Sequence, residues 1–217
     1  MKPVKFILDL LYPPKCTFCE KLLKDEENYL CSKCTALLPK LSADQSRRDI
    51  KHIRQCVFPF KYKDEVRESL VRYKFYGLAA YGPIYADFIA KSIDENEISC
   101  DIISWVPIHR KRYRERGYDQ SKLIAKALAK KLGVPCRKLL IKGANNKRQS
   151  SIDDREERKR NVSGVYRLAT KDALVGKRIL LVDDIVTSGS TISECAAVLK
   201  GAGCTEIYAA AVASAAP

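Results

Sequence analysis

Residues 178–191 constrain the fold of this chain more than any other part of the sequence. They begin with a short apolar run, 179–182, of the kind that forms a buried parallel strand. Two adjacent carboxylates, Asp183 and Asp184, follow where that strand is expected to end. A turn of small hydroxyl residues around a glycine comes next, and the Ala-rich segment 191–200 then predicts a helix.

This order of strand, acids, turn and helix predicts a site for a phosphorylated sugar. Open α/β sheets bind ligands beyond the carboxyl ends of their strands. A helix N-terminus, with free N–H groups and a positive dipole end, holds a phosphate. Carboxylates beside it accept hydrogen bonds from sugar hydroxyls or face a magnesium ion. Taken alone, the two acids would most simply cap the following turn, but their sequence context favours phosphate binding.

Two CxxC pairs near the N-terminus predict a structural zinc site formed by Cys16, Cys19, Cys31 and Cys34. Four thiolates at this spacing can surround one zinc tetrahedrally and leave no open position for catalysis. So small a module cannot fold on hydrophobic burial alone, so the metal would supply its folding energy. The alternative is four unligated buried cysteines. A thioredoxin-like redox pair is disfavoured because no βαβ pattern surrounds either CxxC.

The cysteine count and the N-terminal segment indicate a cytoplasmic protein. The chain has nine cysteines, and an odd count with CxxC pairs favours metal and free thiols in a reducing compartment. The apolar run 6–12 is interrupted by Asp9, is too short to span a bilayer and lacks a small-residue cleavage site. We therefore expect no stable membrane insertion.

The rest of the chain predicts one α/β domain at residues 56–217, preceded by a zinc module and linker at 1–55. The polar, basic stretch 41–54 is the expected linker. In the domain, apolar patterns predict strands near 57–60, 102–107, 139–141, 164–168, 179–182 and 206–212. Helices are expected at 64–76, 81–93, 119–132 and 191–200, the first with Val66, Leu70, Val71 and Phe75 on its buried face.

Positive charge is concentrated in the middle of the chain. The formal net charge is +14, and residues 107–163 carry eighteen Lys or Arg against six Asp or Glu. This concentration implies a polyanionic partner: nucleic acid, phosphates or anionic lipid. The basic runs follow two strands, so they share an edge with Asp183 and Asp184 if the strands are parallel. For residues 110–116, the plainer alternative is the solvated start of a helix.

The run 182–191 resembles the phosphoribosyl-pyrophosphate (PRPP) motif of type I phosphoribosyltransferases, with two acids before a Thr-Ser-Gly-Ser-Thr turn. The upstream run 106–110, with Arg112, the Arg116-Gly117-Tyr118 triplet and the N-terminal CxxC pairs, resembles the ComF family and its ComFC-type competence proteins. The resemblance implies a type I phosphoribosyltransferase-like α/β fold: a mainly parallel sheet flanked by helices, with a small N-terminal four-cysteine zinc module.

The same resemblance implies roles for individual residues. Asp183 and Asp184 would hold the ribose hydroxyls of PRPP, helped by magnesium. The phosphate turn, which would cradle the 5′-phosphate, comprises Thr187, Ser188, Gly189, Ser190 and Thr191. The pyrophosphate loop comprises Pro107, His109, Arg110, Lys111 and Arg112. A mobile loop over 142–161 would close over the ligand and contribute Gln149, Arg158 and Asn161.

Two functions remain open on the sequence. In the first, the chain is a PRPP-binding ComF protein of DNA uptake during natural transformation. Its basic face would bind single-stranded DNA and its zinc module would dock a helicase-like partner. Aromatic residues near the basic run could stack bases: Tyr73, Phe75, Tyr76, Tyr113 and Tyr118. In the second, it is an active phosphoribosyltransferase of nucleotide salvage or synthesis, with an acceptor that no sequence feature names.

Overall fold

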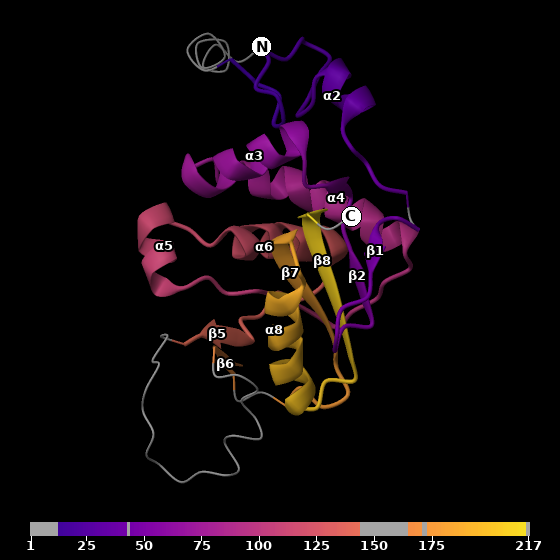
Figure 1. Ribbon diagram of the computed structural model, residues 1–217, viewed down its shortest axis with the longest axis vertical. Coiled ribbons are helices and arrows are strands. Elements are labelled where there is room, and N and C mark those ends of the chain that lie inside the picture. The colour runs from indigo at the N-terminus through magenta and orange to yellow at the C-terminus, as the bar shows by residue number, and fades with distance from the viewer. Residues whose placement is uncertain (1–12, 43, 144–164, 171–172, 216–217) are drawn as a thin grey trace.

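A six-stranded sheet forms the centre of the molecule (Figure 1). The computed structural model describes residues 13–42, 44–143, 165–170 and 173–215. The strands lie in the order β1-β2-β8-β7-β4, with β3 also paired to β8. Their bounds are β1 Arg47–Arg48, β2 Gln55–Val57, β3 Phe60–Lys61, β4 Ile102–Trp105, β7 Arg178–Val186 and β8 Glu206–Ser214. All these pairings are parallel except that of β1 with β2.

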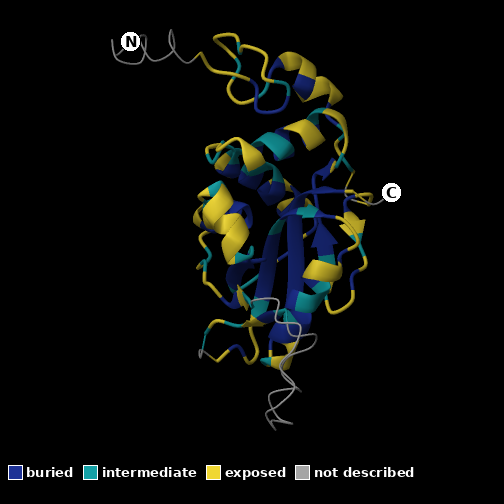
Figure 2. Cartoon of the chain, turned by 60° about the vertical axis from the view of Figure 1, so that its left-hand side comes forward, coloured by how far each residue is buried: buried dark blue, intermediate teal, exposed yellow. Residues whose placement is uncertain are grey.

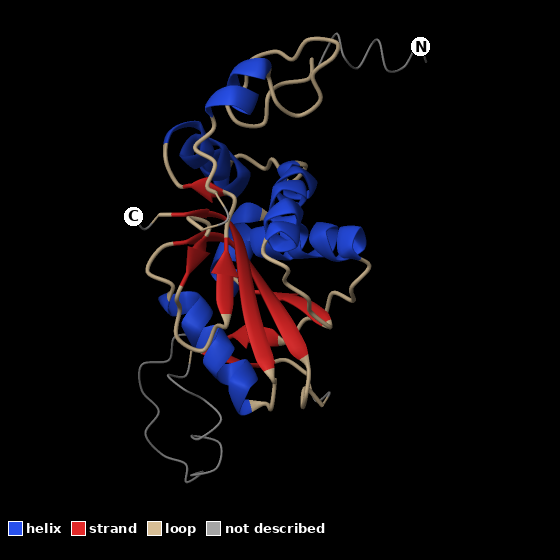
Figure 3. Ribbon diagram, turned by 90° about the vertical axis from the view of Figure 1, so that its right-hand side faces the viewer, coloured by secondary structure: helices blue, strands red, loops and turns tan. Residues whose placement is uncertain are grey.

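Both faces of the sheet are covered, as the alternation of side chains along β7 requires. Leu180 and Val182 belong to one buried cluster, and Ile179 and Leu181 to the other. The first cluster lies under α3 (Asp64–Phe75), α4 (Tyr81–Glu95) and α6 (Gln120–Leu132). The second lies under α8 (Ser190–Gly201), on the opposite side of the sheet (Figure 3). The expected α/β fold with a mainly parallel sheet is therefore confirmed.

Strand β7 is longer than the sequence predicts. It continues to Val186, and Asp183 and Ile185 still pair with β8. The acids therefore lie within the last part of the strand, where the ladder fixes their backbone. Strands β5 (Leu140–Lys142) and β6 (Tyr166–Leu168) form a separate antiparallel pair. The second basic run follows β5, but β5 is antiparallel to its partner and lies outside the main sheet, so the condition of parallel strands for a shared edge with Asp183 and Asp184 is not met.

A short basic helix, α5 (Arg110–Arg116), follows β4. The His109 Nδ1 caps its start by accepting a hydrogen bond from the Lys111 N–H at 3.2 Å, and Gly117 ends it in the left-handed conformation. None of its residues is buried, and exposed residues are yellow in Figure 2. The predicted pyrophosphate loop is thus a loop only up to His109, because the last three of its residues form the first turn of α5.

The N-terminal module packs directly on the main sheet and its helices. Its helix α2 (Ser32–Leu37) follows the second cysteine pair, and Phe18 is fully buried. The Phe18 ring makes edge contacts with Phe60, Tyr85 and Phe88. The module therefore shares its apolar core with the domain, so its folding and that of the domain are energetically linked.

The stretch expected to be a linker contributes to the edge of the sheet. It contains β1, the Phe58 N–H donates to the Ser46 carbonyl at 3.1 Å, and the Arg54 N–H donates to the Ile207 carbonyl at 2.8 Å. The division of the chain at residues 55 and 56 stays a prediction. Within the described ranges, no helix has the length and apolar character needed to span a bilayer.

Candidate functional site

A cavity of about 150 Å³ opens beyond the carboxyl ends of β4 and β7. These parallel strands end at the same edge of the sheet, so the segments that follow them converge. Asp183 and Asp184 of β7 lie in the wall of the cavity. Basic and hydroxyl side chains from other elements complete the lining: Lys74, His109, Arg112, Arg116, Ser121, Lys142, Tyr166 and Thr191.

The two acids are held by different helices. The Ser121 hydroxyl of α6 donates to Asp183 Oδ1 at 2.8 Å, and the Asp184 N–H donates to the same oxygen at 2.9 Å. The Lys74 ammonium of α3 lies 3.1 Å from Asp184 Oδ2. Burial, and then the charge of Asp184, raises the pKa of Asp183 to about 7. A ligand that brings hydroxyl donors or a cation would therefore favour the ionised form of this pair.

A further carboxylate, the buried Asp119, aligns the loop after β4 with the start of α6. One oxygen accepts a hydrogen bond from the Lys122 N–H at 3.1 Å and caps the helix. The other accepts from the Ile108 N–H at 3.4 Å. Burial raises the pKa of Asp119. This carboxyl group fixes both the helix that carries Ser121 and the loop that carries His109.

The phosphate turn joins β7 to α8, and its backbone needs a glycine. Gly189 caps α8 with φ of 81°. The Ser188 and Ser190 hydroxyl oxygens lie 2.9 Å apart, and the Ser190 N–H donates to Ser188 Oγ at 3.3 Å. Because the first N–H groups of a helix have no partner within it, α8 directs donors and a positive dipole end at this turn.

The edge strand β1 contacts the phosphate turn through the side chain of Arg48. The Arg48 guanidinium donates to the Thr187 carbonyl, and through Nη2 to the Ser188 carbonyl at 3.3 Å. The Ile50 side chain lies so close to Gly189 that a Cβ there would come within 2.9 Å of Ile50 Cδ1. Neither Arg48 nor Ile50 is predicted from the sequence, since both lie in the expected linker.

Gly189→Ala is expected to destabilise the protein by about 2–4 kcal/mol, because left-handed backbone strain and overpacking against Ile50 add together. Gly133→Ala is the matched control: Gly133 has φ of 68° at the end of α6, and a Cβ there meets nothing within 4 Å. The control should lose only the strain, about 1–2 kcal/mol. Urea denaturation of both variants measures the difference, and equal losses would contradict the close packing at the turn.

The four predicted zinc ligands cluster, as the CxxC spacing predicts. The sulfur atoms of Cys16, Cys19, Cys31 and Cys34 all lie within 4.8 Å of one another. The Cys19 and Cys31 sulfurs are 3.5 Å apart, near the separation of about 3.8 Å that a tetrahedral site with 2.3 Å bonds requires. Burial raises the pKa of Cys16, but hydrogen bonds from the backbone of Cys19 and Cys31 outweigh this and lower it to about 7. The donor set therefore fits a structural zinc ion.

Comparison with known proteins agrees with both parts of the structure. Residues 119–216 match the phosphoribosyl transferase domain, and residues 7–45 match the double zinc ribbon domain. The chain is 27% identical to competence protein ComFC of Bacillus subtilis over 198 residues, which are 85% of this chain and 78% of that protein. The chain is therefore similar to the ComF competence proteins over most of its length.

Other relatives match the chain over a shorter span. Competence protein F of Haemophilus influenzae is 30% identical over 47% of this chain and 45% of its own length. The DNA utilization protein YhgH of Escherichia coli is 29% identical over 50% of this chain and 48% of its own length. The chain therefore spans about half the length of these two relatives. Among solved structures, a Bacillus subtilis glutamine PRPP amidotransferase matches with a TM-score of 0.46 and 19% identity, over 64% of this chain and 30% of that one.

The cavity brings together only some of the residues that the sequence singles out. Asp183, Asp184, Pro107, His109, Arg112 and Thr191 line it. Arg110 and Lys111 are exposed on α5, and Thr187, Ser188 and Ser190 are exposed in the phosphate turn. Gln149, Arg158 and Asn161 of the predicted mobile loop lie outside the described residues.

Lys74 and Lys142 line the cavity, although no local sequence pattern places either of them there. Lys74 ends near Asp184 because α3 crosses the end of β7, a contact that no local pattern signals. Lys142, at the end of β5, reaches the cavity with its ammonium 5.1 Å from the centre of the Tyr166 ring. Both lysines add positive charge at the site, so their side chains favour an anionic ligand.

Proposed function

We propose that this protein binds PRPP in the cavity at the end of β7. The proposal rests on one observation: an acidic pair and the N-terminal end of a helix lie at the same small cavity. The carboxylates of Asp183 and Asp184 suit sugar hydroxyls, while the start of α8 suits a phosphate. Four cationic side chains line the same cavity: Lys74, Arg112, Arg116 and Lys142.

The proposed pose follows from the charges of the ligand. The 5′-phosphate lies in the phosphate turn, where Ser188, Ser190 and the first N–H groups of α8 donate to it. The ribose hydroxyls donate to Asp183 and Asp184. The pyrophosphate lies toward the loop and helix after β4, where Arg112 and Arg116 face the cavity. Bidentate guanidinium contacts suit phosphate oxygens at this position.

Magnesium accompanies PRPP in this proposal. Carboxylate oxygens and phosphate oxygens are the ligands that this hard cation prefers, and the acid pair at the cavity supplies the first kind. When bound, the ion would neutralise charge on the pyrophosphate group. The protein's own contribution is to orient the sugar through Asp183 and Ser121 and to balance the remaining charge with Lys74.

Replacing both acids should strongly weaken PRPP binding, measured by calorimetric titration in the presence of magnesium. Asp183→Ala/Asp184→Ala is expected to weaken binding by at least about 100-fold, because two charge-assisted hydrogen bonds to the sugar are lost. Asp87→Ala/Asp94→Ala removes the same charge from the far helix α4 and should bind as the wild type does. If the double variant at 183 and 184 bound PRPP with wild-type affinity, the site would be wrongly assigned.

We further propose that the protein acts in DNA uptake during natural transformation and binds single-stranded DNA through α5. Its relatives are named as competence and DNA utilization proteins. Five of the seven residues of α5 are Lys or Arg, and no residue of this helix is buried. A helicase-like partner would dock on the zinc module. A cytoplasmic location suits the nine cysteines, all of which are free thiols in the structure.

The alternative is an active phosphoribosyltransferase of nucleotide salvage or synthesis. Two acids beside a lysine at the cavity favour this alternative. Transfer from PRPP depends on electrostatic stabilisation of a ribosyl cation and its leaving group, which such side chains can supply. Release of pyrophosphate from PRPP, assayed with a panel of nucleobases and amines, separates the two functions. No release above the rate of Asp183→Ala/Asp184→Ala would exclude transfer to those acceptors.

A further inference from the structure

A second, larger cavity lies beside the phosphate turn, at the carboxyl ends of β3 and β8. Its volume is about 520 Å³, within the range of small-molecule sites. Lys61 of β3 pairs in register with Ser214 of β8, and Ser214 pairs with Val186 of β7, directly before the turn. Lys61 and Ser214 line the cavity, so it opens at the same edge of the sheet as the proposed PRPP site.

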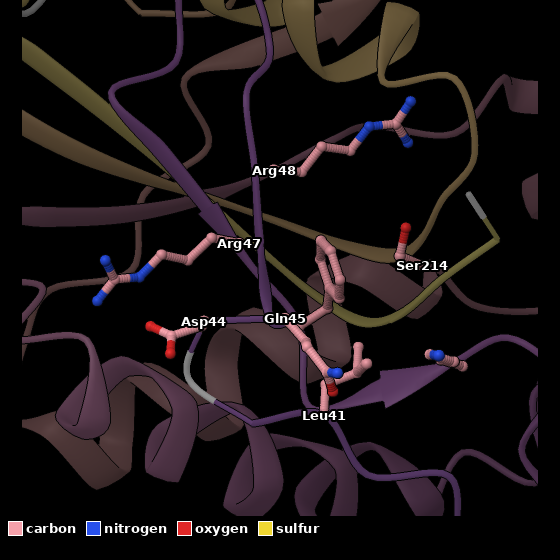
Figure 4. A pocket seen from close by; sticks show the side chains of 8 residues that line it. Leu41, Asp44, Gln45, Arg47, Arg48 and Ser214 are labelled. Atoms are coloured by element: carbon pink, nitrogen blue, oxygen red, sulfur yellow. The ribbon is translucent and has the colours of Figure 1, made fainter. Parts of the chain in front are cut away.

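Positive charge gathers on one side of this cavity. Arg48 and Ser214 lie on the side nearest the turn, whereas Arg47 and Asp44 point the other way (Figure 4). The Arg48 guanidinium is held in place by the Thr187 and Ser188 carbonyls, and its planar fork has further N–H donors. Lys61 is exposed and makes no hydrogen bond or ion pair through its side chain with the described residues. A fixed guanidinium and an uncompensated ammonium together suit a phosphate.

The rest of the lining is apolar or carries an amide. Leu41 and the buried Phe58 supply the apolar surface, and the exposed Gln45 lies beside Leu41 (Figure 4). A planar base can pack on apolar side chains, and an amide can donate to and accept from the edge of that base. An inorganic phosphate would use only the basic side of the cavity. A nucleotide would use both sides.

We propose that this cavity is a nucleotide site distinct from the PRPP site. The phosphate lies between Arg48 and Lys61, and the base packs against Leu41 and Phe58 within reach of Gln45. The nucleotide is either free or one unit of a nucleic-acid strand, since both present the same phosphate and base. The proposal does not depend on PRPP binding, because no residue of this cavity lines the site of Asp183 and Asp184.

The test is calorimetric titration of the full chain with two probes, dAMP and a twelve-nucleotide oligo(dA) without a terminal phosphate. Lys61→Ala is expected to weaken nucleotide binding about tenfold, the loss expected for one charge-assisted hydrogen bond. Lys63→Ala is the matched control, because Lys63 is exposed, carries the same charge, lies two residues away and does not line the cavity. Its affinity should equal that of the wild type.

Three comparisons decide the outcome. A tenfold loss for dAMP alone identifies a free nucleotide as the ligand, and a loss for oligo(dA) identifies a strand. Asp183→Ala/Asp184→Ala should keep wild-type dAMP affinity, because dAMP does not occupy the PRPP site in this proposal. The proposal is overturned if neither probe distinguishes Lys61→Ala from Lys63→Ala, or if dAMP binding is lost in the acid variant and kept in Lys61→Ala.

Discussion

Cys34→Ser is expected to abolish zinc binding and to unfold the N-terminal module. Cys34 is 3% exposed, and its sulfur lies within 4.8 Å of the other three thiols, so a serine leaves the ion with an incomplete tetrahedral set. Structural zinc contributes on the order of 10 kcal/mol to the folding of modules of this size. Metal analysis of the purified protein should fall from one zinc per chain to none.

Unfolding of the N-terminal module is expected to destabilise the main domain as well, because the module and the domain share a core. Phe18 packs its ring against Phe60 and Tyr85. The Ser69 hydroxyl of α3 donates to the Thr17 carbonyl at 2.7 Å, and the Arg72 guanidinium donates to the Phe18 carbonyl. Removing a buried phenylalanine costs about 3–5 kcal/mol, so the thermal midpoint of the whole chain should fall by roughly 10 °C or more.

Two further variants separate the metal from the packing. Cys136→Ser makes the same substitution at a half-buried thiol outside the cluster and should keep both the zinc and nearly all of the stability. Phe18→Ala should keep the zinc but lose about 3–5 kcal/mol of stability. A Cys34→Ser protein that still held one zinc per chain would show that the four cysteines are not the ligand set.

The parts of the site that the sequence predicts correctly rest on local patterns. The strand before Asp183, the turn at Gly189 and the helix after it follow one another in the chain, so their order alone defines their geometry. The CxxC spacing likewise places its four sulfurs together because each pair is a single turn. These local patterns can be interpreted without knowing how distant segments of the chain pack together.

The parts that the sequence misses depend on distant segments. Lys74 and Asp184 are far apart in the chain, and only the crossing of α3 over the end of β7 joins them. Arg48 supports the phosphate turn from a stretch that composition alone assigns to a linker. Polarity predicts that such a stretch is solvated, but its backbone pairing with the edge of the sheet orders it instead.

The aromatic residues of α3 show that its buried face differs from the face that the sequence predicts. In α3 the buried positions are Val66, Ser69, Leu70 and Tyr73, one continuous helical stripe. Phe75 lies off that stripe and is 63% exposed, so the expectation that it faces the core is wrong. Tyr73 is fully buried and its hydroxyl donates to the Gln120 carbonyl at 2.9 Å, so it cannot stack a base.

Binding of single-stranded DNA is expected to depend steeply on salt. If the five cationic residues of α5 each neutralise one phosphate, the slope of log affinity against log salt concentration is about −3.5. Raising the salt fourfold should then weaken binding by roughly 100-fold. Fluorescence anisotropy with a labelled oligonucleotide, repeated at several salt concentrations, measures this slope.

Two pairs of charge variants locate the DNA on the surface. Arg110→Ala/Arg114→Ala removes two exposed cations one turn apart on α5 and should reduce the magnitude of the slope by about 1.4. Lys126→Ala/Lys130→Ala removes two exposed cations with the same spacing on α6 and should leave the slope unchanged. Equal changes of the slope in both variants would mean that DNA binding depends on the net charge of the protein and not on α5.

The exposed aromatic side chains are expected to contribute to the free energy of DNA binding in a way that does not depend on salt concentration. Tyr113 of α5 is 49% exposed, and the Arg116 guanidinium lies 4.9 Å from the centre of the exposed Phe75 ring. Stacking of one base contributes about 1–3 kcal/mol and involves no released counterion. Tyr113→Ala should therefore weaken binding by roughly tenfold at every salt concentration and keep the wild-type slope. If the slope falls as well, Tyr113 acts by positioning the cations of α5 and not by stacking.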